Sequence, residues 1–243
     1  MTEHPIIFSG EMVQAILEGK KVQTRRVIKP QPTYDTACGG HWYWFTGTWK
    51  SICVGCSTVE KFTSRMLTPS VSLNHPRPRC PYGIPGDLLW VRETWATPGN
   101  YDSIKPSELS ASHFTRDQIV YRATEQYGDV YYRWRPSIFM PRWASRITLE
   151  VVSVRVEQVQ EIDQADAKAE GAPALFGPNN PPFGYREGFE RLWDSINAKR
   201  TIIHEWEDDD GIIHRDKVPG GYSWQSNPWV WAVEFKVVED TES

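Results

Sequence analysis

The residues best suited to chemistry lie in one short basic stretch near the N-terminus. Residues 19–26 read Gly-Lys-Lys-Val-Gln-Thr-Arg-Arg, which places four cations and one hydroxyl within eight residues. Such a cluster can bind an anion such as a phosphate. Alternatively, a partly desolvated lysine with a lowered pKa can activate Thr24 as a nucleophile. The plainer alternative is a solvated basic turn, which is what most short charge runs are.

The segment before this stretch predicts a helix over residues 10–18. Ser9 suits the N-cap, and Gly19 suits the position just past the C-terminus. One apolar face is formed by Met12, Val13, Ile16 and Leu17. The basic residues should follow as a turn held at a fixed place, and we expect that the core does not require their side chains.

Composition limits the function classes. The chain has 243 residues, 40% hydrophobic content and a net charge of −4. A protein that coats nucleic acid would be basic overall, so any such contact must be local. The sequence has no run of eighteen apolar residues and no layout typical of a signal peptide, so we expect a soluble cytoplasmic protein with no membrane contact.

Alternating apolar residues predict several strands. The strongest patterns span residues 88–95, 146–159 and 229–238. A bulge or bend is expected near residues 151–152, where the apolar phase changes. Shorter strands are expected at 5–8 and 119–122. Two further helices are indicated, one at 164–170 between Asp163 and Gly171 and one ending near Asn197. This order predicts a mixed α+β protein, a small barrel with helices outside.

Two segments differ in character from the rest of the chain. Residues 33–80 contain all four cysteines and several aromatic residues without a clear period, which indicates an insertion. Residues 200–222 are rich in acidic residues and predict an exposed hairpin or flap. We therefore expect a single domain, residues 1–243, with insertions at about 33–80 and 200–222.

The cysteines raise the question of a metal. Cys53 and Cys56 have the spacing of a zinc knuckle, with Cys38 before them and Cys80 after them. Four thiolates in an insertion with little regular structure predict a structural, tetrahedral zinc site, which would not be catalytic. Buried free thiols or disulfides are the alternatives.

Several motifs occur in an order that resembles a known family. They are Gly19-Lys20-Lys21-x-x-Thr24-x-Arg26 after a helix, Pro85-Gly86-Asp87 before a strand, Ala169-Glu170-Gly171 at the end of a short helix, and a final Trp-Val-x-x-Val-Glu-Phe strand. Together they resemble the ASCH (activating signal cointegrator homology) domain of the PUA-like superfamily. Gln23-Thr24-Arg25-Arg26 and Trp90-Val91-Arg92-Glu93-Thr94-Trp95 resemble the long phage and prophage members in particular. The resemblance implies a PUA-like β-barrel.

The resemblance also implies an activity. A small bacterial ASCH enzyme hydrolyses the acyl amide of N4-acetylcytidine with a lysine, a threonine and a glutamate, and Lys21, Thr24 and Glu170 match these positions. Thr24 would attack, a neutral Lys21 would take its proton, and Glu170 would position a proton or water, with no cofactor in catalysis. Arg26 or a backbone N–H would stabilise the oxyanion.

Other residues are candidates for binding the substrate. They are Lys20, Arg26, Arg92 and Glu93. Arg92 and Glu93 have an equally good structural interpretation, which is an ordinary ion pair across the barrel.

Two function classes follow. The first is an amidohydrolase acting on an N4-acylated cytidine or a similar modified base. The second is a non-catalytic PUA-like reader of RNA or modified nucleobases. Tryptophans of the insertion at 42, 44 and 49 could stack a base, whereas Trp193, Trp229 and Trp231 are expected in the core.

Overall fold

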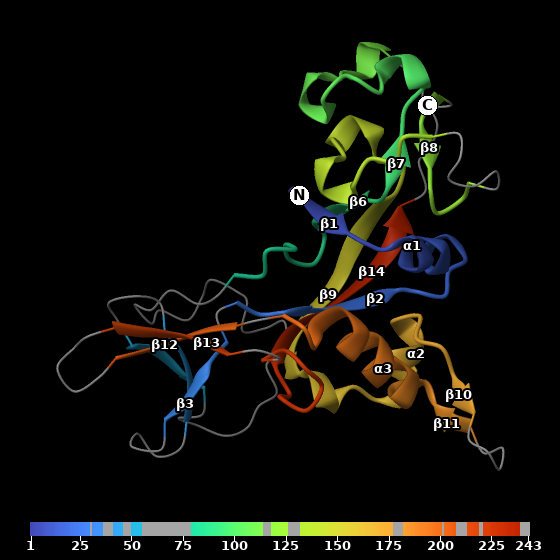
Figure 1. The fold of residues 1–243 in the computed structure, drawn as a ribbon. Helices are drawn as coiled ribbons and strands as arrows, with labels where there is room; N and C mark the ends of the chain where they lie inside the picture. The colour runs from blue at the N-terminus through green and yellow to red at the C-terminus, as the bar shows by residue number, and fades with distance from the viewer. Residues whose placement is uncertain are drawn as a thin grey trace. The chain divides into compact units, whose positions relative to one another are not determined.

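The chain folds as a mixed α+β protein with a five-stranded sheet (Figure 1). The computed structural model describes residues 1–29, 31–35, 41–45, 50–54, 79–113, 118–125, 132–176, 182–200, 202–207, 213–218 and 221–238. Within these residues the α-helices are α1 (Gly10–Leu17), α2 (Gln164–Ala169) and α3 (Tyr185–Asn197). The mixed α+β class expected from the sequence is confirmed.

The strands of the main sheet pair in an order that differs from their order in the chain. The spatial order is β1 (Glu3–Ile7), β6 (Leu88–Arg92), β9 (Thr148–Gln158), β14 (Trp229–Val238) and β2 (Gln23–Val27). β1 is parallel to β6, and β6 is antiparallel to β9. β14 runs antiparallel to β2, because Ile28 N donates to Trp229 O while Phe235 N donates to Val22 O.

The main sheet is open within the described residues. A closed barrel requires the two outermost strands to pair with each other. The described strands end in two separate edges, β1 and β2, and no described pairing joins them. The part of the chain that the structure describes is therefore an open, mostly antiparallel sheet and not the closed barrel that was expected.

Smaller sheets account for the remaining strands. β3 (Thr33–Asp35), β4 (His41–Phe45) and β5 (Lys50–Val54) form one of them. Two-stranded pairs are β7 (Trp95–Ala96) with β8 (Val120–Tyr121), β10 (Leu175–Phe176) with β11 (Pro182–Gly184), and β12 (Ile202–Glu207) with β13 (Ile213–Val218). The β12–β13 pairing confirms the hairpin expected within residues 200–222.

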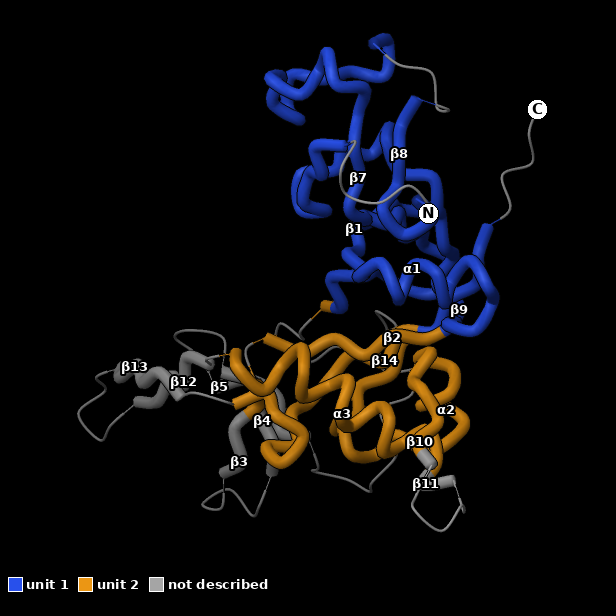
Figure 2. Tube along the Cα trace, turned by 45° about the vertical axis from the view of Figure 1, so that its right-hand side comes forward, with its two compact units in different colours: residues 1–22, 80–153, 234–243 blue, residues 23–79, 154–233 orange. Residues whose placement is uncertain are grey.

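The chain divides into two compact units (Figure 2). Unit 1 comprises residues 1–22, 80–153 and 234–243, and unit 2 comprises residues 23–79 and 154–233. Each has an apolar core: one cluster in unit 1 surrounds Trp95 and Met140, and one in unit 2 surrounds Phe189 and Trp193. The single domain with insertions stays a prediction.

Helix α1 forms as its capping residues predict. Ser9 Oγ accepts from the N–H of Met12 at 3.4 Å, and Gly19 has a φ of 69°, which is the left-handed conformation of a helix stop. Val13 and Ile16 are buried, so the expected apolar face packs inward. In the described residues no helix has the length and apolar character needed to cross a membrane.

Helices α2 and α3 of unit 2 are fixed to each other by a glutamine. Asp163 caps α2 by accepting from the N–H of Asp166 at 2.7 Å, as expected. Gln164 Oε1 then accepts from the N–H groups of Tyr185 and Arg186 at 2.6 and 3.1 Å, where α3 begins. These two bonds satisfy N–H groups that a helix start leaves without a partner.

The change of apolar phase in residues 146–159 has a structural counterpart in β9. Leu149 and Val151 are buried, Val152 is exposed, and Val154 is buried again. The burial phase therefore shifts near residue 152, as the sequence indicated. The boundary between the units falls one residue later, between residues 153 and 154.

Replacement of Gly188 tests how tightly α3 packs. A Cβ at this position would clash with the backbone carbonyl oxygen of Pro173, which cannot rotate away. We expect Gly188→Ala to lower the free energy of unfolding by about 1–3 kcal/mol, measured by urea denaturation. Gly10→Ala is the control, since its Cβ would lie 4.0 Å from Ala123 Cα, and it should change stability by less than about 1 kcal/mol. Equal effects in both variants would contradict the close packing.

Candidate functional site

The two lysines of the basic stretch have different environments. The N–H groups of Lys20 and Lys21 both donate to Ala15 O, at 2.8 and 3.0 Å, so the chain turns back after α1. The Lys20 side chain is 71% exposed and pairs with Glu18 at 2.6 Å. Lys21 is only 1% exposed. The solvated-turn interpretation therefore holds for Lys20 and is wrong for Lys21.

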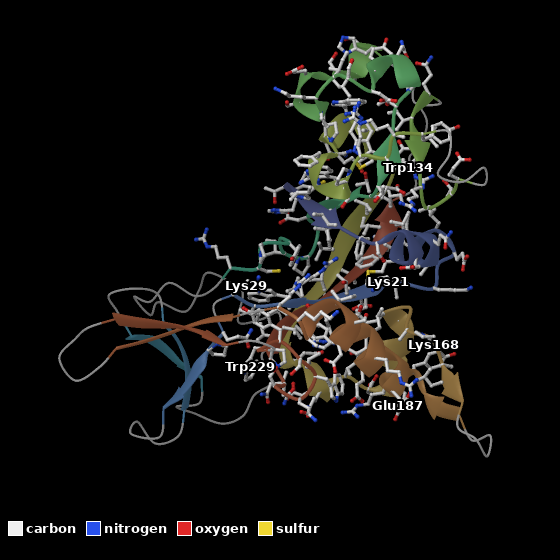
Figure 3. All side chains as sticks on the ribbon, viewed as in Figure 1. Lys21, Lys29, Trp134, Lys168, Glu187 and Trp229 are labelled. Carbon is white, nitrogen blue, oxygen red and sulfur yellow. The ribbon has the colours of Figure 1, made fainter. Side chains whose placement is uncertain are left out.

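Lys21 is held against an aromatic ring in unit 1. Its Nζ lies 5.8 Å from the centroid of the Phe8 ring, and Phe8 is itself buried (Figure 3 labels Lys21). The aromatic face attracts an ammonium, whereas burial disfavours any charge, so the two effects oppose each other at Lys21. Lysine is almost never fully buried in proteins, so its burial marks this position as a functional candidate.

The residues after Lys21 form strand β2 and not a turn. Gln23, Thr24 and Arg25 are all at most 5% exposed, so the expectation that the core does not require this stretch is wrong. The physical reason is the pairing of β2 with β14 together with the ion pairs of Arg25. Because side chains alternate along a strand, Thr24 and Arg26 share one face of β2, and Gln23 and Arg25 share the other.

Arg25 is the centre of a buried ionic cluster in unit 2. Its guanidinium is fully buried and contacts three carboxylates. Nε donates to Glu157 at 2.7 Å, Nη2 donates to Asp166 at 2.6 Å, and Nη1 donates to Glu170 at 3.3 Å. Nη1 also donates to Gln23 Oε1 at 2.9 Å. These contacts tie β2 to β9 and to α2.

The charges of the cluster explain its pKa shifts. Burial by itself lowers the pKa of Arg25, but the carboxylates of Glu170, Glu157 and Asp166 raise it above its ordinary value. For Asp166 the same effect has the opposite sign, because burial disfavours the charged carboxylate and so raises its pKa. Three neighbours nevertheless hold the pKa of Asp166 below its ordinary value. They are Arg25, through its hydrogen bond and charge, Arg155, which donates to Asp166 at 2.7 Å, and the side-chain amide of Gln23.

Glu170 lies at the end of α2, as the sequence predicted. It is the C-cap residue, it is followed by Gly171 with a φ of 77°, and it is 5% exposed. A carboxylate at a helix C-terminus is opposed by the macrodipole. The contact with Arg25 offsets that unfavourable position, so Glu170 is part of a charge cluster and not a surface residue.

Arg92 and Glu93 do not pair with each other. Glu93 is 1% exposed and accepts two bonds from Arg146, at 2.8 and 3.0 Å. The Arg146 guanidinium also lies 4.1 Å from the centroid of the Tyr121 ring. Arg92 is only partly buried, and its guanidinium lies over the Trp90 ring. The ion pair expected at Glu93 therefore exists, with a different arginine.

The proposed zinc ligands fall largely outside the described residues. Cys38 and Cys56 lie outside them, and for Cys53 only the backbone, in β5, is described. Cys80 is a half-buried free thiol, and burial raises its pKa to about 11 against the opposing hydrogen bond of Tyr82. The zinc site stays a prediction. The tryptophans at 42, 44 and 49 belong to the same segment, and their side chains are not described.

The tryptophans expected in the core divide into two groups. Trp193 and Trp231 are 4% and 3% exposed, which confirms the prediction for them. Trp229 is only half-buried, so its assignment to the core was wrong. It begins β14, where its backbone N–H and C=O are both engaged by the Gln31 side chain at 2.7 and 3.0 Å.

Sequence reasoning missed the partners of Arg25. Glu157 and Asp166, which contact Arg25, were not among the candidate residues, and neither was Arg155, which pairs with Asp166. Their only sequence signal is an acidic residue in the first turn of a short helix and alternating charges in a strand. Such patterns are common on solvated surfaces, so they do not single out a buried cluster.

Comparison with known proteins adds no relative. No protein-family model, no curated protein and no solved structure matches this chain.

Removal of the Arg25 charge tests the ionic cluster. Arg25→Met would leave Glu157, Asp166 and Glu170 close together without their main cation. We expect the free energy of unfolding to fall by about 3–5 kcal/mol, the usual result of breaking a buried ion pair on one side. Lys20→Met is the control, because its exposed ion pair is worth at most about 1 kcal/mol. If both variants unfold at the same denaturant concentration, the cluster does not stabilise unit 2.

The lowered pKa of Asp166 predicts a pH dependence. A carboxylate whose pKa is lower in the folded state stabilises the fold. This contribution is fully present above the pKa of the unfolded chain, about 3.9, and is lost as the pH falls through the pKa of the folded state. The difference in free energy of unfolding between the native chain and Asp166→Asn should therefore be largest near neutral pH and shrink in acid. Denaturation series at several pH values measure it. If Arg155 is also replaced by methionine, this pH dependence should be smaller. A difference in free energy of unfolding between the native chain and Asp166→Asn that does not change with pH would contradict the ion pairing.

Proposed function

We propose that this protein is an ASCH-type, PUA-like amidohydrolase that removes an acyl group from N4-acylated cytidine or a similar cytosine nucleoside. The observation that carries the proposal is the burial of the polar residues that match the family's positions: Lys21 in unit 1 is 1% exposed, and Thr24 and Glu170 in unit 2 are 3% and 5% exposed. Buried polar residues of these types concentrate at functional sites. No metal or other cofactor takes part in the proposed reaction.

The strand geometry of β2 supports the assignment of roles around Thr24. Thr24 and Arg26 are two residues apart in the strand, so their side chains lie on the same face of β2. This is the arrangement that an attacking oxygen and an oxyanion stabiliser need. Lys21 precedes Thr24 by three residues in the chain.

The proposed reaction has two steps. Thr24 Oγ adds to the acyl carbonyl carbon and gives up its proton to a base. The resemblance assigns this base to Lys21 in its neutral form. The tetrahedral intermediate then breaks the C–N bond, and the proton is delivered to the departing N4 amine, which gives cytidine and a threonine ester. Water then hydrolyses the ester to the carboxylic acid and restores the hydroxyl. Glu170 contacts Arg25, whose side chain lies on the face of β2 opposite to Thr24, so its part in the proposed site is to hold Arg25 and not to position this water.

Turnover of N4-acetylcytidine tests the proposal. We expect the native protein to release cytidine and acetate, and chromatography measures the cytidine formed. Because Thr24 is buried in a strand, Thr24→Val is preferable to alanine, since it keeps the shape and removes only the hydroxyl. It should lower kcat by at least about a thousandfold, whereas Thr24→Ser should retain turnover. Absence of cytidine with the native protein, or full activity of Thr24→Val, would overturn the proposal.

Lys21→Arg separates an enzyme from a non-catalytic reader of RNA or modified nucleobases. A guanidinium stays protonated, so the variant should be inactive if Lys21 is the base. The native rate should rise with pH through an apparent pKa below the value of about 10.4 for free lysine. A reader would keep its affinity for the nucleoside in Lys21→Arg and show no turnover. Thermal melting of the variant verifies that it is folded.

A further inference from the structure

The side chain of Arg25 spans the width of a neighbouring strand. It starts on β2 and contacts Glu157 on β9, although β14 lies between these two strands. Ile28 N donates to Trp229 O, which places these two residues opposite each other. Three residues away along each strand, Arg25 is therefore opposite Ala232. Because Ala232 has only a methyl side chain, the guanidinium can pass over β14 to reach β9.

Strand β2 has an attachment on one side only in the described sheet. It pairs with β14 and lies at the edge of the five strands. An edge strand lacks half of the backbone bonds that fix a central strand. The guanidinium of Arg25 supplies a second attachment, because it contacts one carboxylate of β9 and two of α2, at 2.6–3.3 Å.

This attachment acts on the residue next to the proposed nucleophile. Arg25 and Thr24 are consecutive in β2, so their side chains point to opposite faces of the strand. A carboxylate that binds Arg25 therefore influences the Thr24 hydroxyl through the backbone of the strand. Glu170, which accepts from Arg25 Nη1 at 3.3 Å, is such a carboxylate.

We propose that Arg25 is a positioning residue for the proposed hydrolysis, which fixes the Thr24 hydroxyl through strand β2, and that Glu170 serves the reaction by holding Arg25. The inference rests on the proposed function, because Thr24 is the nucleophile of that reaction. It replaces the catalytic role that the resemblance gives Glu170 with an indirect one.

Glu170→Gln distinguishes an indirect role from a catalytic one. The variant leaves two arginines facing two carboxylates, so the cluster stays balanced in charge. A displaced Thr24 slows the first step, so kcat for N4-acetylcytidine should fall by about tenfold with KM unchanged, and no ester should accumulate. A Glu170 that activates water would give the opposite result, a rapid release of about one cytidine per chain and an acetyl ester on Thr24 in mass spectra. That result would overturn the inference.

Arg25→Lys tests whether Glu170 acts through the guanidinium. Lysine keeps the positive charge but lacks the planar fork that contacts three carboxylates at once. The double variant with Glu170→Gln should have about the same kcat as Arg25→Lys, because both changes interrupt the same contact. If the two losses multiply, Glu170 acts independently of Arg25, and the inference is wrong.

Amide hydrogen exchange, followed by NMR, measures how firmly Thr24 is held and needs no turnover. The N–H groups of Thr24 and Arg26 face β14, as that of Ile28 does, because donors alternate along a strand. In Glu170→Gln we expect both to exchange about tenfold faster, while the amide of Trp193 in α3 keeps its rate. Equal acceleration at Trp193 would indicate a loss of global stability, and an unchanged rate at Thr24 would indicate no hold on β2. Either result overturns the inference.

Glu187→Gln is the matched control. Glu187 is a half-buried carboxylate of unit 2 in the first turn of α3, where it accepts from Gln164 at 3.4 Å (Figure 3 labels Glu187). Its replacement should change neither kcat nor the exchange rate at Thr24. If the native protein releases no cytidine, the proposed function fails, and the exchange rates still decide whether Glu170 and Arg25 hold Thr24.

Discussion

The organisation of unit 2 depends on the buried guanidinium of Arg25. A fully buried arginine is tolerated only when its charge and its N–H groups are satisfied. Glu157 from β9, and Asp166 and Glu170 from α2, supply this compensation around one strand residue. The same contacts determine the face on which Thr24 lies, because its neighbour in the strand must point into the cluster. The candidate site is thus a consequence of an ionic packing requirement.

Unit 1 solves a similar problem with different partners. Arg146 satisfies the buried carboxylate of Glu93, whereas the buried Arg135 donates to the carbonyl oxygens of Tyr101 and Ile104. Those carbonyls belong to the irregular segment after β7, so the guanidinium stabilises a loop that has little regular hydrogen bonding of its own. Arg92 differs from both, since no described carboxylate compensates it.

Local features of the chain were predictable because their physics is local. Ser9 and Gly19 define α1, Asp163 and Gly171 define α2, and the alternation of residues 229–238 matches β14. In each case a cap or a period depends on neighbours within a few residues. The burial of Glu170 was not predictable in this way, because its partner Arg25 lies 145 residues away in the chain.

The sequence by itself determined helices α1 and α2, the strand at residues 229–238, the mixed α+β class and the chemical types near Thr24. Tertiary structure alone decided that residues 23–27 are a buried strand, that Glu93 pairs with Arg146, and that the described sheet is open. These outcomes depend on partners far away in the chain, such as Arg146, 53 residues from Glu93, and Glu170, 145 residues from Arg25. A basic stretch has the same local pattern whether water or distant carboxylates surround it, so only the packed structure separates the two.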